Sequence, residues 1–396
     1  MSAPASTEQA LADFLARCDP ASPAGRDWYV QRPQPFAPWM SQALRGVPTA
    51  KILLVGQAGV GKSTELARLE DGLQEDFTLV RSPLDQILDL TVVGWHDILV
   101  LSALWRGRGG RSDSHVPLGV IPSPALSRLE RDLVEGLSPA GTPPPTGVQA
   151  FRNDPKVVHE RIESGRAQFW DRSVAALQEE GRPKPIALIL DGLEKLPPHL
   201  MTRLFRDERR HLLDLPFRVV VTAPLGMSFQ TYFGEVESDF LAVTRLRALS
   251  HRTQEPGFRF LRELADKRGA VEVLSGPLLE ESISWSGGLP RQLLQLLAAA
   301  ATQAMMDGLL RVERESFLRA RRKVSERWQY QLEPADYVSL AKPDEERTTT
   351  ERARLLALGA LLEYDQPDGG LGLGMNPLVG ALLKERRPDR SVGPSP

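Results

Sequence analysis

AKILLVGQAGVGKSTELARL, residues 50–69, decides the fold of this chain. The run ILLV at 52–55 is wholly apolar, as expected of a β-strand that is covered on both faces. Gly56 begins a loop of small residues, and a pattern typical of an amphipathic helix follows the loop. A strand, a glycine-rich loop and a helix in this order predict the first unit of an α/β domain built on a parallel sheet.

The loop GQAGVGKS, residues 56–63, has the Walker A spacing GxxxxGK[ST]. Its backbone N–H groups can surround a phosphate group, and the helix that follows presents the positive end of its dipole. Lys62 is expected to reach the β- and γ-phosphates of a nucleoside triphosphate, and Ser63 to bind Mg²⁺. An ordinary strand, turn and helix is the alternative, but a chance match with both flanking elements is rare. The loop residues expected to bind the nucleotide are Gly56, Gln57, Ala58, Gly59, Val60, Gly61, Lys62, Ser63 and Thr64.

Composition narrows the class of protein. The 396 residues can form two or three domains, and 41% hydrophobic residues are enough for their cores. Cys18 is the only cysteine, so neither an intrachain disulfide nor a cysteine metal cluster can form. The six histidines are scattered, which leaves Mg²⁺ as the expected metal. No apolar run could cross a bilayer and no export signal is recognisable, so we expect a soluble, cytoplasmic protein with no membrane partner.

Further short apolar runs predict the remaining strands. Helical stretches lie between these runs, and strands separated by helices imply a parallel sheet that is covered on both sides. Helices dominate beyond residue 250, and the leucine-rich stretch 352–364 is expected to be helical, before a turn, a short strand and a final helix. The expected strands are 52–55, 77–80, 186–190, 218–222 and 240–246.

This pattern divides the chain into four expected parts. The fold class is α/β, with a P-loop parallel sheet flanked by helices, a small helical lid domain and a C-terminal winged-helix-like domain. The parts are an N-terminal extension at 1–26, a nucleotide-binding domain at 27–250 with a mobile insertion at about 106–150, the lid at 251–325, and the winged-helix-like domain at 326–396.

Two acidic residues follow the apolar run 186–190 in the segment IALILDGLEKL. Asp191 ends this run and should therefore lie at the carboxyl edge of the sheet, where open α/β sheets bind ligands. We expect Asp191 to take part in the Mg²⁺ site. Glu194 is expected to polarise the attacking water, and the alternative is a solvated carboxylate in the first turn of a helix.

Two further residues are candidates for sensing the nucleotide. Thr222 ends the apolar strand in RVVVTAP, so its hydroxyl could orient water or the γ-phosphate, although a strand-terminal threonine without a role is the alternative. In WSGGLPRQLL, Pro290 lies in the first turn of a helix and Arg291 follows it. The guanidinium of Arg291 could reach the phosphates and couple the position of the helical domain to the nucleotide, although a surface arginine is the alternative.

GQAGVGKST, ILDGLE, VVVTAP and SGGLPR, in this order, resemble the AAA+ superclass, and most closely its STAND-like and origin-recognition-like relatives. The resemblance covers about residues 27–325 and implies the strand order 5-1-4-3-2 and a C-terminal winged helix. Tyr29 and Val30 resemble the segment that packs against adenine. The resemblance assigns Lys62 and Ser63 to Walker A, Asp191 and Glu194 to Walker B, Thr222 to sensor 1, and Gly288, Pro290 and Arg291 to the sensor 2 region.

The chain also departs from the pattern of the superclass. Its Walker B segment ends in DGLE, as in NACHT-like proteins, and lacks the contiguous acidic pair of motor ATPases, so we expect slow or partner-stimulated hydrolysis. Arg206, Arg209 and Arg210 lie in the region of an arginine finger, but we favour a solvated arginine-rich helix face as their explanation.

These features favour an ATP- and Mg²⁺-dependent switch whose lid passes the nucleotide state to an unknown effector or sensor protein, in signalling or defence, with nucleotide-dependent homo-oligomers. The alternative is an origin-recognition-like DNA-binding ATPase. The basic stretch 319–327 and the arginines Arg106, Arg108 and Arg111 could contact DNA, but a net charge of −2 argues against DNA as a partner. A metabolite kinase is a third possibility and does not explain Glu194 or the GLPR helix.

Overall fold

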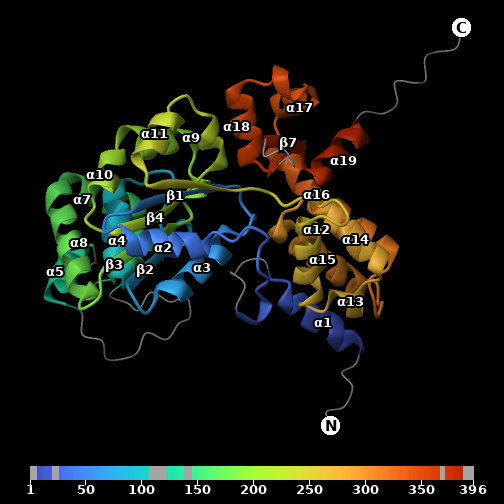
Figure 1. The fold of residues 1–396 in the computed structure, drawn as a ribbon, viewed down its shortest axis with the longest axis horizontal. Coiled ribbons are helices and arrows are strands. Elements are labelled where there is room, and N and C mark those ends of the chain that lie inside the picture. The colour runs from blue at the N-terminus through green and yellow to red at the C-terminus, as the bar shows by residue number, and fades with distance from the viewer. Residues whose placement is uncertain (1–6, 20–25, 107–122, 138–144, 366–370, 387–396) are drawn as a thin grey trace, which may run out of the picture. The chain divides into compact units, whose positions relative to one another are not determined.

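The computed structural model describes residues 7–19, 26–106, 123–137, 145–365 and 371–386. Figure 1 labels their helices and strands. The chain forms two compact units. Unit 1 comprises residues 1–35, 57–64 and 246–396, and unit 2 comprises residues 36–56 and 65–245.

Unit 2 is built on a parallel sheet of five strands with the order β2-β3-β4-β1-β5. This order confirms the arrangement 5-1-4-3-2 that the resemblance to the AAA+ superclass implies. Every residue of β1 and β3 is buried, which agrees with the wholly apolar runs in the sequence. The strands are β1 Lys51–Gly56, β2 Thr78–Pro83, β3 Ile186–Asp191, β4 Arg218–Ala223 and β5 Ala242–Leu246.

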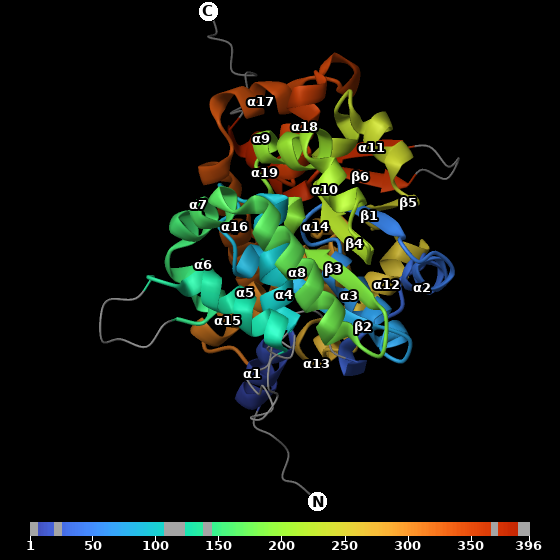
Figure 2. The ribbon, with the colours of Figure 1, turned by 90° about the vertical axis from the view of Figure 1, so that its left-hand side faces the viewer.

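Helices flank this sheet. In Figure 2, α4, α5 and α8 lie side by side, and α5 buries Leu126, Leu129 and Leu133. The helices are α2 Ala37–Gly46, α3 Lys62–Leu73, α4 Trp95–Arg106, α5 Pro124–Val134, α6 Gly147–Asn153, α7 Pro155–Ser164, α8 Arg166–Gly181, α9 Pro198–Thr202, α10 Arg209–Leu213 and α11 Phe233–Asp239. A π-helical turn, Arg203–Asp207, joins α9 to α10.

The expected insertion at 106–150 is described in part. Its residues 107–122 and 138–144, with Arg108 and Arg111 among them, lie outside the described residues, as does the side chain of Arg106. The described part contains α5 and α6, and Ser123 caps α5 by accepting a hydrogen bond from the N–H of Leu126. The apolar face of α5 is buried, so this part of the insertion belongs to the core of unit 2.

The helices of unit 1 surround a second hydrophobic core. The N-terminal helix α1 contributes Leu11 and Phe14 to it, and Cys18 follows directly after that helix, whereas the sequence alone indicates an extension at 1–26. Burial raises the pKa of the Cys18 thiol to about 12, which leaves it unreactive. The helices are α1 Thr7–Arg17, α12 Pro256–Asp266, α13 Ala270–Val273, α14 Gly276–Trp285, α15 Pro290–Met306 and α16 Arg314–Gln331.

The C-terminal part of unit 1 has two helices, a hairpin and a last helix, which is the order of a winged-helix-like domain. The elements are α17 Pro334–Ala341, α18 Thr349–Ala357, β6 Leu361–Asp365, β7 Leu371–Met375 and α19 Pro377–Arg386. The turn between β6 and β7, residues 366–370, lies outside the described residues.

The expectation of one helix over 352–364 is wrong. The helix ends at Ala357, and Gly359, with a φ of +68°, turns the chain into β6, which pairs antiparallel with β7. A short apolar run has the same appearance in a buried helix and in a buried strand, so its period could not separate the two.

None of the described helices has both the length and the apolar character that spanning a membrane requires.

Candidate functional site

The loop that follows β1 has the conformation that its sequence predicts. Gly59 has a φ of +83°, and a Cβ at this position would lie 2.9 Å from the Cβ of Arg291, so both the backbone and the packing require glycine. Lys62 is buried, and its Nζ donates a hydrogen bond to the carbonyl of Gln57 at 2.9 Å. Ser63 and Thr64 are half-buried at the start of α3. The lysine ammonium is therefore held by the loop itself.

The side chain of Gln57 joins the loop to the C-terminal part of unit 1. Its amide nitrogen donates to the carbonyls of Leu356 at 3.1 Å and Leu361 at 2.6 Å, and its amide oxygen accepts from the N–H of Glu363 at 3.4 Å. Gln57 is 4% exposed. The Walker A pattern accepts any residue at this position, so nothing in the sequence indicates this contact.

Tyr29 and Val30, the residues expected to contact adenine, come shortly before Arg32 in the chain, and Arg32 contacts the same loop. The guanidinium of Arg32 donates to the carbonyl of Val60 at 2.7 Å and to that of Arg247 at 2.6 Å. Val30 is part of the helical core, and the carbonyl of Tyr29 accepts from Lys267 at 2.7 Å. Contact of Tyr29 and Val30 with a base stays a prediction, and Arg32 is a residue that the sequence reading did not assign to the site.

Arg291 contacts the loop that follows β1. Pro290 is buried in the first turn of α15, and the backbone N–H of Arg291 donates to the carbonyl of Gly59 at 3.2 Å. The side chain of Arg291 packs against Gly59. A nucleotide-sensing role for Arg291 stays a prediction.

In unit 2, Asp191 ends β3 and is buried. Its Oδ2 accepts a hydrogen bond from Arg81 of β2 at 2.9 Å, and its Oδ1 has no hydrogen-bond partner. A buried carboxylate oxygen without a partner is costly, and a cation is the partner that its charge suits. No cluster of three or more histidine, cysteine or acidic ligands occurs among the described residues.

Thr222 holds the turn that follows Asp191. Its hydroxyl accepts hydrogen bonds from the N–H groups of Gly192 and Leu193, both at 3.1 Å. Glu194 lies partly buried in the short helical turn Leu193–Lys195. Thr222 therefore positions the backbone that carries Glu194, and its expected role in orienting water stays a prediction.

The three arginines in the region expected for an arginine finger lie in or near the π-helical turn. Arg209 forms an ion pair with Asp239 at 2.5 Å, and the guanidinium of Arg206 lies 5.7 Å from the ring centre of Tyr232. Arg210 lies in α10. Arg209 and Arg206 thus have structural contacts, and the identity of an arginine finger stays open.

The sheet brings several of these positions to one edge. The strands β1, β3 and β4 are parallel, with Leu54 opposite Thr222 and Leu190 opposite Val221. The carboxyl ends of β1 and β3, at Gly56 and Asp191, therefore lie at the same edge. The loop leaves the sheet at this edge, because its first residue is bonded to Gly56.

No protein-family model matches this sequence, and no curated protein matches it either. Among solved structures, the chain is similar to Cdc6p from Pyrobaculum aerophilum, with 14% identity over 94% of this chain and 98% of that chain and a TM-score of 0.45. It is also similar to the Aeropyrum pernix ORC2 protein, with 13% identity over 93% and 98% and a TM-score of 0.49. A third similar structure is Drosophila ORC bound to DNA, with 13% identity over 98% and 94% and a TM-score of 0.44.

Proposed function

We propose that this chain, which has the AAA+-type P-loop fold, binds ATP with Mg²⁺ and hydrolyses it slowly as a molecular switch. The observation that carries the proposal is the complete Walker A loop that leaves the sheet at the edge where Asp191 keeps one buried carboxylate oxygen without a partner. A loop of this shape suits a polyphosphate, and the free oxygen of a carboxylate that Arg81 binds only through Oδ2 suits the metal ion that accompanies it.

The residues would have distinct roles. The N–H groups of the loop surround the β-phosphate, and Lys62 exchanges the carbonyl of Gln57 for phosphate oxygens. Ser63 and Asp191 would hold Mg²⁺, which neutralises charge on the phosphates. Glu194 is the candidate base for water, held in place by the turn that Thr222 binds.

We propose that the nucleotide state reaches the C-terminal residues through the loop. Gln57 binds residues 356–363 with its side chain and Lys62 with its carbonyl, so a change at Lys62 alters a residue that the C-terminal domain holds. The lid, residues 251–325, responds through the bond from Arg291 to Gly59. The receiver is a partner protein, DNA or a second copy of this chain.

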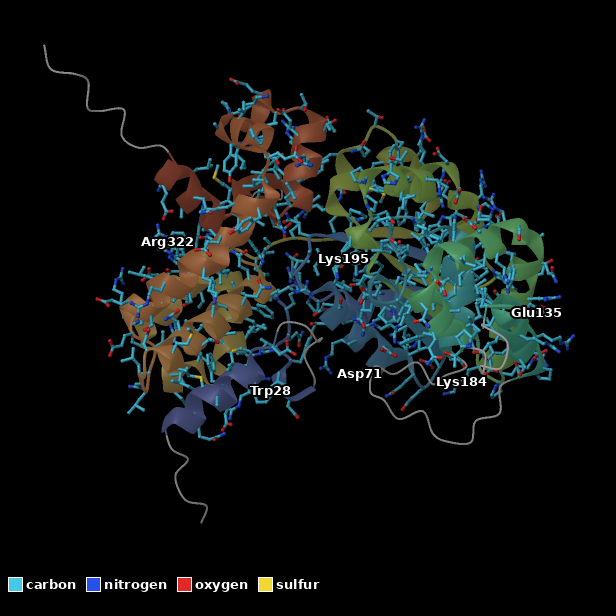
Figure 3. All side chains as sticks on the ribbon, turned by 180° about the vertical axis from the view of Figure 1, so that it is seen from behind. Trp28, Asp71, Glu135, Lys184, Lys195 and Arg322 are labelled. Carbon is cyan, nitrogen blue, oxygen red and sulfur yellow. The ribbon has the colours of Figure 1, made fainter. Side chains whose placement is uncertain are left out.

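The experiment on nucleotide binding is Lys62→Ala. We expect this variant to lose at least about 100-fold in ATP affinity, because a charged hydrogen-bond donor to the phosphates is removed. Isothermal titration with ATP and Mg²⁺ measures the loss. Lys184→Ala, which removes an exposed lysine labelled in Figure 3, is the matched control. Unchanged ATP affinity in a folded Lys62→Ala protein would refute the assignment of the loop.

DNA binding of the origin-recognition type is a second candidate function. As the partner of this chain, DNA has better support than an effector or sensor protein. The observation that favours it is the basic face of α16. Arg322 and Lys323 are exposed and, among the described residues, form no ion pair; Figure 3 labels Arg322. Unpaired cations on a helix can bind phosphates of a duplex, even in a chain whose net charge is −2.

A gel-shift titration with duplex DNA, with and without ATP, separates the two outputs. Salt-sensitive binding that weakens in Arg322→Gln supports DNA as the partner. Equal migration of free and protein-treated duplex at all protein concentrations would favour a protein partner.

A further inference from the structure

Unit 1 contains a cavity of about 300 Å³ beside the Walker A loop, which we call the nucleotide loop. One wall is formed by Ala58 and Gly59 of the loop, and the start of α15 adds Arg291. Arg327 of α16 and residues 356–359, at the end of α18 and just after it, also line the cavity. This volume is at the lower end of the range that binds small molecules.

The charge of the cavity is strongly one-sided. Arg291 and Arg327 both line it, and no acidic residue does so among the described residues. Within the described residues, neither Arg291 nor Arg327 forms an ion pair with a carboxylate. Burial, together with the charge of Arg291, lowers the pKa of Arg327 to about 10. Two cations that share a partly buried space repel each other, and an anion between them would remove that repulsion.

Arg327 is held in place by amide side chains. Its guanidinium donates to Gln295 at 3.0 Å and to Gln292 at 3.3 Å. Gln292 is itself fixed by Asn376, whose amide donates to it at 3.0 Å, and by the carbonyl of Trp285. These acceptors are neutral, so they orient the guanidinium without neutralising it. The positive charge thus remains available to a ligand, and little further ordering is needed for binding.

We propose that this cavity binds a phosphoryl group, with Arg327 as a second cation beside Arg291. A guanidinium offers two parallel N–H groups that match phosphate oxygens, and two guanidiniums match the double negative charge. The proposal rests on the proposed function, because Ala58 and Gly59 belong to the nucleotide loop. The phosphoryl group has two sources, the terminal phosphate of bound ATP or a free phosphate ion.

Calorimetry with Arg327→Gln tests the proposal. The probes are a non-hydrolysable ATP analogue, ADP and inorganic phosphate. If the terminal phosphate occupies the cavity, the variant loses about 10- to 100-fold in affinity for the ATP analogue and keeps its affinity for ADP. If a free phosphate ion occupies it, the variant loses phosphate binding that the wild-type protein has without nucleotide. Arg327→Lys keeps the charge but loses the paired donors. We expect its affinity for the probe to lie between those of the wild-type protein and Arg327→Gln.

Arg321→Gln is the matched control. Arg321 lies on the same helix with its guanidinium over the ring of Trp285, 4.3 Å from the ring centre, and does not line the cavity. We expect this variant to bind all three probes as the wild-type protein does. Melting curves of all variants show whether they are folded.

Three results would overturn the proposal. One is wild-type affinity of Arg327→Gln for every probe, and another is an equal loss of ADP and ATP analogue, which would indicate a structural role. The third is a wild-type protein that binds ADP and the ATP analogue equally and does not bind phosphate; the proposed ATP binding would then still stand. If the wild-type protein binds neither nucleotide but binds phosphate through Arg327, the ATP proposal fails and the cavity assignment is supported.

Discussion

The ammonium group of Lys62 and the carbonyl of Gln57 are joined by a hydrogen bond of 2.9 Å. Phosphate oxygens are stronger acceptors for an ammonium group than a neutral carbonyl, so ATP would draw Lys62 away from Gln57. The side chain of Gln57 holds the carbonyls of Leu356 and Leu361 and the N–H of Glu363. One residue thus connects Lys62, the lysine proposed to bind phosphate, to the C-terminal helices and hairpin.

Replacing Gln57 tests this connection. In Gln57→Ala, three buried backbone groups lose a partner, so we expect the free energy of unfolding to fall by about 2 kcal/mol. The amide of Glu363 should exchange with solvent faster, because its acceptor is gone. Urea unfolding and amide hydrogen exchange measure the two effects. Ala58→Ser, at the exposed neighbouring position, is the control, and unchanged exchange at Glu363 in Gln57→Ala would contradict the connection.

At the scale of elements, α4, α8 and α10 of unit 2 bring His96, Trp170 and His211 together, and α7 places His159 against α4. The ring of His96 lies 4.8 Å from that of His211 and 5.2 Å from that of Trp170. Burial, followed by repulsion from His211, lowers the pKa of His96. His159 of α7 has the opposite shift, because its hydrogen bond to Asp97 of α4, at 2.8 Å, raises its pKa.

These opposite shifts predict opposite pH dependences. The stabilisation from His159 is fully present below the unfolded pKa of about 6.5 and is lost as the pH rises through the higher folded value. His159→Gln should therefore cost about 1 kcal/mol more at about pH 5.5 than at about pH 8. Urea unfolding at both pH values measures the difference.

His96→Gln is the matched comparison. A lowered pKa makes protonation of His96 unfavourable in the folded state, so its cost appears as the pH falls below about 6.5. Removing His96 should relieve that cost, and the variant should gain stability relative to the wild-type protein at acid pH. If the free energy of unfolding changes with pH in the same direction in both variants, His96 and His159 do not control the pH dependence of the stability of unit 2.

At the scale of the whole molecule, unit 1 is assembled from three separate stretches of the chain. The nucleotide loop 57–64 is one of them, and it belongs to the same unit as α15, α16 and the C-terminal domain. We therefore expect a ligand on this loop to act on unit 1, which contains residues 251–325 and the C-terminal helices and hairpin. This arrangement suits a switch in which the nucleotide controls association with a partner.

Association can be measured as a change of mass. Size-exclusion chromatography with light scattering, in ADP and in a non-hydrolysable ATP analogue, should give different masses, because only the analogue has a terminal phosphate for Arg291 and Arg327 to bind. Arg327→Gln should reduce the difference. Equal masses in both states would contradict nucleotide-dependent association. They would favour a protein that acts on DNA, or a scaffold that ATP only stabilises.

The amino-acid sequence determined the features that depend on neighbours along the chain. Apolar runs ending in Gly56, Asp191 and Thr222 predicted the strands, and their parallel order placed these residues at one edge. The SGGLPR segment predicted that Arg291 begins a helix, and the structure places it against Gly59. Such features follow from backbone geometry and hydrophobic period, both of which are local.

Only the tertiary structure decided the contacts between distant residues. The contacts of Gln57 with Leu361 and of Arg81 with Asp191 have no signature in residue spacing, because folding and not sequence joins each pair. The same holds for the cavity that Arg327 and the loop both line. The helix α1 packs into the helical core because its apolar face is buried there. The composition of the segment that follows α1 instead indicates an extension at residues 1–26. The leucine-rich stretch 352–364 fits a buried helix and a buried strand equally well. Pairing with β7 makes its last residues, 361–364, a strand.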